Sequence, residues 1–294
     1  SYLTDNIASN PLPTFLHITD IHGDRVRFNN AVKMADAIGV DAIIDTGDDV
    51  FFNSTDSVAF IGDSLSGKNL VYLPTIGNHD SYTLTEQGMY EKFIDSHKTG
   101  LVLDSNVSYS TYYYKDFADK KLRLISVNQF QYRGKSNNAT ERNYHQAQID
   151  FLCGALLNAP DDYGIIVMIH TPEANPTKSA GYTKFYQDNV PYFNSGASIA
   201  PIYEIVDAFI SGVALNKTFD NVSGNNPATF TVNVDFSGKN DSEFICFVSG
   251  HRHADGVYYL PNMTNKILMI NSVCSNSWSH LNTGGSPGSN YPYS

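Results

Sequence analysis

The sequence predicts an α/β fold with mixed β-sheets. Short apolar strands alternate with amphipathic helices early in the chain, and hairpin patterns appear later. Of the 294 residues, 41% are hydrophobic, which is enough to bury a sizeable core. Strand–helix alternation favours parallel pairing and hairpins add antiparallel pairs, so both kinds of pairing are expected.

Helical spacing and turn residues delimit the elements of the first part of the chain. Phe28, Val32 and Ala35 recur at the period of a helix, and Gly39 is a typical helix end. The expected elements are a strand at 14–19, this helix, a strand at 42–46, a short helix at 58–65, a strand at 70–76 and a helix around Phe93.

The second part begins with a predicted hairpin and then returns to alternation. The run at 165–170 is continuously apolar, as in strands buried on both faces. The expected order is paired strands at 109–114 and 122–128, a helix before Pro160, the strand at 165–170, an amphipathic helix at 202–210 and strands at 244–249, 257–260 and 267–273.

We expect one domain over residues 1–274, because no internal repeat or linker interrupts the chain before residue 275. The polar, Asn- and Gly-rich segment 212–240 is interpreted as a surface insertion with a hairpin at 228–236. The Gly-rich segment 275–294 is interpreted as a flexible tail or linker.

Charge and hydropathy narrow the classes of partner. The formal charge is −11, which disfavours long nucleic acid and anionic membrane surfaces. The longest aliphatic run, 165–169, is far shorter than the ~20 residues of a membrane span. Three Cys are too few for a disulfide framework. The low content of charged residues, 17%, favours an extracellular or cell-surface location, and the composition predicts no oligomeric state.

Five of the expected strands end in polar clusters. Because ligands of open α/β sheets bind beyond the carboxyl ends of strands, we expect these clusters to meet at one edge. The clusters are Asp20-x-His22, Gly47-Asp48, Gly77-Asn78-His79-Asp80, His170 and Gly250-His251-x-His253.

Imidazole, carboxylate and amide groups without sulfur are the ligands of a borderline-hard metal ion rather than of structural zinc. Seven candidate ligands are too many for one ion. They suit two ions that share a carboxylate, as in hydrolases of phosphate esters.

In their order and composition, the five clusters resemble the sequence blocks of the calcineurin-like metallophosphoesterase superfamily, and they extend from residue 20 to residue 253. The resemblance implies a four-layer αββα sandwich, in which two mixed β-sheets pack together and helices flank them. It also makes 1–274 a metallophosphoesterase domain.

The resemblance further implies a role for each residue. Asp20, His22 and His253 would hold one metal ion. Asn78, His170 and His251 would hold a second, and Asp48 would bridge the two. His79 would be a general acid or charge stabiliser, oriented by a hydrogen bond that it donates to Asp80.

The implied activity is hydrolysis of a small phosphorylated substrate, with a metal-bridging water or hydroxide as nucleophile and two divalent or trivalent ions, of which Mn, Fe and Zn are preferred. The substrate stays open among phosphomonoesters, phosphodiesters and nucleotides. Two alternatives are a binding module that keeps structural metals and a metal-dependent hydrolase of another bond.

Three further polar residues are interpreted less specifically. Asp49 is expected to be a turn or cap residue, and His17 a hydrogen-bonded residue of the core or of the surroundings of the site. Asn128 ends a strand, where a place at the site and a structural role are equally plausible.

Overall fold

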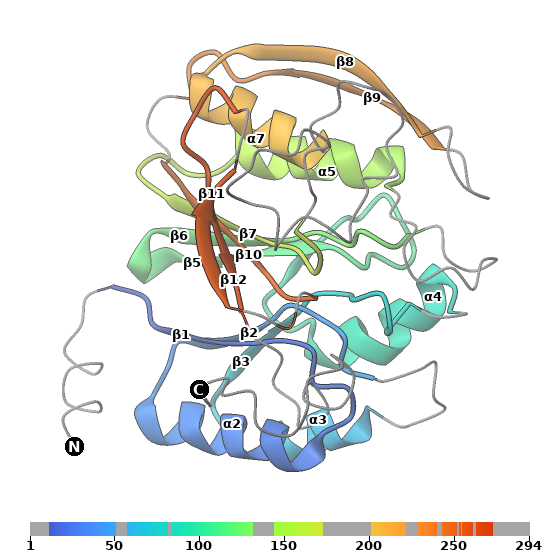
Figure 1. The fold of residues 1–294 in the computed structure, drawn as a ribbon, viewed down its shortest axis with the longest axis vertical. Coiled ribbons are helices and arrows are strands. Elements are labelled where there is room, and N and C mark those ends of the chain that lie inside the picture. The colour runs from blue at the N-terminus through green and yellow to red at the C-terminus, as the bar shows by residue number, and fades with distance from the viewer. Residues whose placement is uncertain are drawn as a thin grey trace, which may run out of the picture.

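The fold is a sandwich of two β-sheets with helices on both outer faces (Figure 1). The computed structural model describes residues 12–50, 58–81, 84–131, 144–172, 201–221, 228–239, 243–251, 253, 255–260 and 263–272. This arrangement confirms the predicted four layers. The segment 275–294, expected to be a tail or linker, lies outside the described residues.

The smaller sheet contains β1 (Phe15–Ile18), β2 (Ala42–Asp45) and β3 (Val71–Pro74), all parallel, in that spatial order. Helices α2 (Arg25–Ile38) and α3 (Ala59–Leu65) cover its outer face (Figure 1). Consecutive parallel strands need crossover connections, and α2 and α3 supply them.

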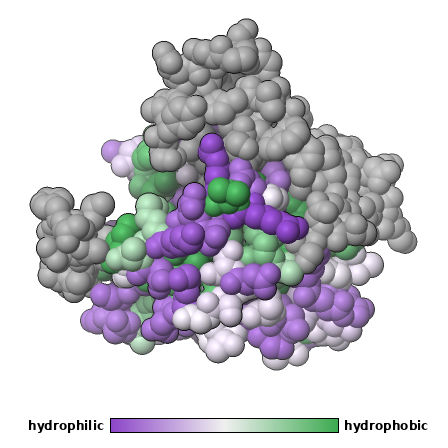
Figure 2. Space-filling view, turned by 90° about the horizontal axis from the view of Figure 1, so that it is seen from below, coloured by the Kyte–Doolittle hydropathy of each residue, from purple (hydrophilic) through white to green (hydrophobic). Residues whose placement is uncertain are grey.

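Helix α2 ends at Gly39, as the sequence predicts. The side chain of Asp24 accepts a hydrogen bond from the backbone N–H of Arg27, and Gly39 ends the helix at φ 78°. Phe28 and Val32 are buried against the sheet. Hydrophilic residues predominate on the opposite side of this layer, which faces the viewer in Figure 2.

The larger sheet is mixed and has seven strands in the described part of the chain. In spatial order the strands are β11 (Gly256–Tyr259), β12 (Leu268–Asn271), β10 (Glu243–Ser249), β7 (Gly164–Met168), β6 (Leu122–Ser126), β5 (Tyr113–Phe117) and β4 (Val102–Leu103). The four consecutive strands from β12 to β6 are parallel. Strand β11 pairs antiparallel with β12, and β5 pairs antiparallel with both β6 and β4.

A buried apolar cluster joins the two sheets. Ile44 and Leu73 of the smaller sheet pack with Leu124, Ile166 and Val248 of the larger one. Alternate residues of each strand point to opposite faces, so β6 and β7 contribute side chains to this cluster and to the helix-covered side. The double burial explains the continuous apolar run of β7.

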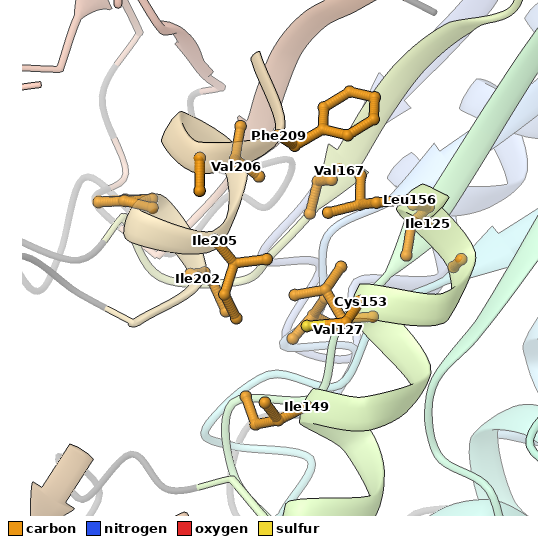
Figure 3. Close-up of a cluster of buried hydrophobic side chains, with 14 of the residues drawn as sticks. Ile125, Val127, Ile149, Cys153, Leu156, Val167, Ile202, Ile205, Val206 and Phe209 are labelled. Carbon is orange, nitrogen blue, oxygen red and sulfur yellow. The ribbon is translucent and has the colours of Figure 1, made fainter. Parts of the chain in front are cut away.

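Helices α5 (Gln146–Leu157) and α7 (Pro201–Ser211) cover the other face of the larger sheet. Figure 3 shows Ile149 and Leu156 of α5 and Ile205 of α7 directed at one buried cluster. No helix in the described ranges is long and apolar enough to cross a membrane.

The segment 228–236 does not form the expected hairpin by itself. It contains β9 (Ala228–Asp235), which pairs antiparallel with β8 (Ala214–Asn221) and forms a separate two-stranded sheet outside α5 and α7 (Figure 1). Phe219 and Phe230 are buried with ring centroids 5.5 Å apart. Phenylalanines on the inner face therefore attach this polar-looking segment to the domain.

The helix expected around Phe93 is irregular. A single α-turn, α4 (Glu86–Met89), continues into a π-helical segment (Tyr90–Ile94) and a 3₁₀ turn (Asp95–His97). Met89 and Phe93 remain buried in the cluster between the sheets, as their spacing predicts.

Candidate metal centre

All seven predicted metal ligands lie close together beyond the carboxyl ends of β1, β2, β3, β7 and β10. Backbone hydrogen bonds join the loops: Asp20 N–H donates to Gly47 O at 2.8 Å, and Gly250 N–H donates to His170 O at 2.9 Å. Both sheets therefore contribute to one site, as the strand-end pattern predicts.

Five of these seven residues have a left-handed backbone, which side chains other than glycine rarely adopt. Among the described non-glycine residues only Lys121 and Asp162 share this feature. Such conformations cost of order 1 kcal/mol or more each and concentrate at functional sites. The five φ angles are 51° at Asp20, 48° at His22, 62° at Asp48, 66° at His251 and 50° at His253.

Asp20, His22 and His253 form the first group of converging ligand atoms, all within 4.8 Å of one another. His253 Nε2 lies 3.1 Å from Asp20 Oδ1, and His22 Nε2 lies 3.4 Å from His253 Nε2. The second oxygen of Asp20 accepts hydrogen bonds from Thr19 Oγ1 and from His251 N–H, both at 2.8 Å. These bonds hold the carboxylate with Oδ1 toward the histidines.

Asp48, His170 and His251 form the second group. His170 Nδ1 lies 2.7 Å from Thr46 O, and a carbonyl can only accept, so Nδ1 carries a proton. His170 Nε2 then faces Asp48 Oδ2 at 3.2 Å, Asn78 Oδ1 at 3.0 Å and His251 Nδ1 at 3.2 Å. Electron-pair donors surround this nitrogen, so a proton or a metal cation must lie among them.

Asp48 connects the two groups. It also belongs to a third set of converging atoms, with His22 and His79. Its Oδ1 accepts the backbone N–H of His79 at 2.7 Å, while Oδ2 faces His170. A carboxylate between two ligand sets is the arrangement expected of a residue shared by two ions.

The electrostatics of the site favour bound positive charge. Burial opposes ionisation of Asp48, yet the neighbouring imidazoles of His170 and His79 hold its pKa well below the usual range. Burial likewise opposes ionisation of Asp20, but the hydrogen bond from His253 and the charge of His170 lower its pKa to about 2. Burial would lower the pKa of His170, and the charge and hydrogen bond of Asp48 instead raise it to about 9.

Without metal, the two carboxylates thus draw a proton onto a buried imidazole. The donor set, Asp oxygen, Asn oxygen and His nitrogen without sulfur, fits ions such as Mn, Fe or Zn. The residues present therefore fit two metal ions, which the first and second groups can hold.

His79 is partly exposed. Its side chain is 20% exposed, close to the 26% of the candidate ligand His253, whereas that of Asp48 is 2% exposed. His79 Nε2 lies 3.9 Å from Asp48 Oδ2, and its ring meets that of His22 edge-on at 4.7 Å. The imidazole therefore borders the ligand groups from the open side.

Asp80 does not make the expected hydrogen bond to His79 among the described contacts. Its carboxylate accepts three backbone N–H groups instead, those of Asp48, Gly77 and Val50. Burial, followed by the charge of Asp48, raises the pKa of Asp80 to about 7 against these hydrogen bonds. The neighbouring loops, rather than the imidazole, determine the orientation of this side chain.

The other three polar residues noted in the sequence are hydrogen-bonded or buried within the fold. His17 Nε2 is 2.9 Å from Thr46 Oγ1, a hydrogen-bonded place near the site as expected. Asn128 is fully buried and accepts Phe130 N–H at 2.8 Å, which gives it a structural role. Asp49 belongs to none of the three described ligand groups, and burial together with Asp45 raises its pKa well above the usual range.

Sequence reasoning missed Gln129. Its amide Oε1 accepts Thr171 N–H at 2.7 Å and its Nε2 donates to Thr171 O at 2.9 Å. These two bonds join the loop after β6 to the residue that follows His170. A Gln directly after a buried strand was the available signal, and it is too common to single out.

A family profile described as calcineurin-like phosphoesterase matches residues 13–212.

The chain belongs to this family.

Among solved structures, 25 chains match this calcineurin-like phosphoesterase. One is the crystal structure of a dimetal phosphatase from Danio rerio, with a TM-score of 0.54 and 12% sequence identity over 90% of this chain and 88% of that one. At this identity the likeness shows the shared fold. No curated protein matches the sequence. The calcineurin-like phosphoesterase fold therefore presents the three ligand groups at the edge where its sheets meet.

Proposed function

We propose that this calcineurin-like phosphoesterase hydrolyses small phosphoesters with two metal ions. Asp20, His22 and His253 would hold one ion, and Asn78, His170 and His251 the other. Asp48 would contribute to both, and its place between the two groups is the observation that carries the proposal. Mn, Fe and Zn suit this donor set.

When bound, two such ions supply positive charge that polarises a phosphoester and acidifies water held beside it. The residues of the chain keep the ligand atoms in place before substrate arrives. Thr46 O holds the tautomer of His170 that directs Nε2 inward, and the left-handed loops aim the side chains of Asp20 and Asp48.

The imidazole of His79 is the candidate proton donor to the leaving oxygen. Its backbone N–H is committed to Asp48 Oδ1, but its ring borders the ligand groups and is partly exposed. A general acid must reach both the proton and the substrate, which a buried ligand cannot do.

The substrate class is proposed from charge and site chemistry. The formal charge of −11 favours small phosphoesters over long nucleic acid. The neighbour from Danio rerio is named a dimetal phosphatase, which makes phosphomonoesters the first substrates to test and phosphodiesters the second.

The experiment measures metal content and hydrolysis together. Protein loaded with Mn²⁺ is tested on p-nitrophenyl phosphate and bis-p-nitrophenyl phosphate, and bound metal is counted by elemental analysis. We expect two ions per chain and turnover of at least one substrate. Asp48→Asn should lose at least one ion and most of the activity, because it removes the shared carboxylate.

Asp36→Asn is the matched control, since Asp36 pairs with Lys68 on the outer side of α2, away from the ligand groups. It should retain both ions and full turnover. One ion per chain at saturation would contradict the dinuclear proposal. Two ions with no release of phosphate or phosphomonoester would favour the alternatives of a binding module or a hydrolase of another bond.

A further inference from the structure

We propose that Asp80 is a positioning residue that clamps the loop carrying Asp48 to the loop carrying Asn78, and that it acts on Asp48 rather than through His79. The proposal rests on the function proposed above, because it concerns the residue that would serve both ions. It replaces the orienting hydrogen bond expected from the sequence.

The contacts of Asp80 carry the inference. Its Oδ2 accepts the N–H of Asp48 at 2.7 Å and the N–H of Gly77 at 2.8 Å, while Oδ1 accepts the N–H of Val50 at 3.2 Å. The residue is 1% exposed. One buried carboxylate thus bridges the loop after β2 and the loop after β3.

These N–H groups have no other acceptor among the described residues. A buried N–H without an acceptor is costly, so the three donors strongly favour the loop arrangement that keeps Asp80 in reach. Two of the donors, Asp48 and Val50, flank the position of Asp49, which fixes the course of that turn.

The two loops touch so closely that small displacements matter. A Cβ atom on Gly47 would lie 2.6 Å from Gly77 N, and a Cβ atom on Gly77 would lie 2.2 Å from Asp48 Oδ1. Real Cβ contacts are never this short, so both facing positions need glycine. The clamp therefore acts across a contact that leaves no room for a side chain.

Hydrogen bonds therefore fix both the backbone and the side chain of Asp48. Asp80 accepts its backbone N–H in the left-handed conformation, φ 62°, and the N–H of His79 fixes its Oδ1. Oδ2 is left facing His170. Removing the clamp should release the backbone of Asp48 and misplace the oxygen that faces His170.

The first test uses amide hydrogen exchange on the metal-free protein. In Asp80→Asn, the side-chain NH₂ can accept no hydrogen bond, so at least one of the three N–H groups loses its acceptor. We expect exchange at one or more of Asp48, Val50 and Gly77 to accelerate roughly 10- to 100-fold, the equivalent of leaving a buried donor without its acceptor. Unchanged exchange at all three amides would overturn the clamp.

Asp207→Asn is the matched control. The Asp207 carboxylate also accepts two backbone N–H groups, from Thr264 at 3.0 Å and Asn265 at 2.9 Å, but in the loop between β11 and β12. It should leave exchange at the three site amides as in wild type. Should Asp80→Asn fail to fold, Asp80→Ser, whose shorter side chain also loses the clamp, takes its place with the same expectations.

The second test separates the clamp from an effect through His79. A Mn²⁺ titration should show the dissociation constant raised roughly 10- to 100-fold in Asp80→Asn, as for lost partners of metal ligands, and unchanged in His79→Ala. In the double variant the two losses of turnover should multiply. A different result would contradict the clamp: the double variant turns over no more slowly than His79→Ala, and Asp80→Asn binds Mn²⁺ as tightly as wild type. Asp80 would then act through His79.

The outcomes keep the two proposals distinct. A wild-type protein that binds Mn²⁺ without hydrolysing any phosphoester would contradict the proposed function, yet amide exchange and Mn²⁺ affinity would still decide the role of Asp80.

Discussion

The neighbouring residues Asn78, His79 and Asp80 differ in burial and in the groups that they contact. Asn78 and Asp80 are buried and directed at His170 and at backbone N–H groups, whereas the imidazole of His79 is partly exposed. We therefore predict that His79→Ala keeps both metal ions and lowers kcat by roughly 10²- to 10⁴-fold for alkyl phosphates. The loss should be smaller for p-nitrophenyl phosphate, because p-nitrophenolate leaves without a proton. Steady-state kinetics on both substrates measure the difference.

His145→Ala serves as the control for removing an imidazole. His145 Nδ1 lies 3.3 Å from Glu86 Oε2, and the residue belongs to none of the ligand groups described. It should leave both rates unchanged. An equal loss on both substrates in His79→Ala would mean that His79 stabilises charge rather than donating a proton, and loss of metal would make it a ligand.

For single residues, the sequence indicated which side chains come together at the site but not which contacts fix each of them. The Asp-x-His and His-x-His patterns at strand ends could be predicted, because residue types and apolar strands can be recognised from a few neighbouring positions in the sequence. The left-handed backbone of Asp48 and the partners of Asp80 depend on the contact between two loops about 30 residues apart, so no local pattern could reveal them.

Among the elements, the β8–β9 hairpin shows how a polar segment becomes part of the fold. Phe230 is 2% exposed, stacks on Phe219 and meets Tyr144 edge-on at 6.2 Å. We predict that Phe230→Ala lowers the free energy of unfolding by about 3–5 kcal/mol, as for other buried Phe. Urea denaturation measures the loss. Mn²⁺ affinity should stay unchanged, because no hairpin residue belongs to the ligand groups described.

Asn233→Ala is the control on the exposed side of the same strand, and it should change stability by less than about 0.5 kcal/mol. If Phe230→Ala lowers the free energy of unfolding no more than Asn233→Ala does, the hairpin does not need this contact. The sequence predicted a hairpin at 228–236, which was wrong: this segment supplies one strand, and its partner is the preceding strand β8. It predicted the buried strand β7 well, because burial on both faces leaves a continuous apolar run.

For the whole molecule, the site acts as a junction of the two sheets. Asp20, Asp48 and Asn78 follow strands of the smaller sheet, while His170 and His251 follow strands of the larger one. Besides the apolar cluster of Ile44 and Ile166, the described contacts between the sheets include these ligand groups. Ions bound there would join the two halves of the sandwich.

Removing metal should therefore destabilise the entire fold rather than the loops alone. Ligands that bind only the folded state stabilise it by an amount that grows with their concentration, about 2.7 kcal/mol per site at 100 times the dissociation constant. We predict that EDTA-treated protein melts at a lower temperature than Mn²⁺-loaded protein and that Tm rises with added Mn²⁺. In Asp48→Asn the rise should largely disappear, because the shared carboxylate is gone, while Asp36→Asn should follow wild type. If the Tm of wild type is the same after EDTA treatment and after addition of Mn²⁺, these ligand groups do not bind the ion. The two sheets would then have no metal link between them.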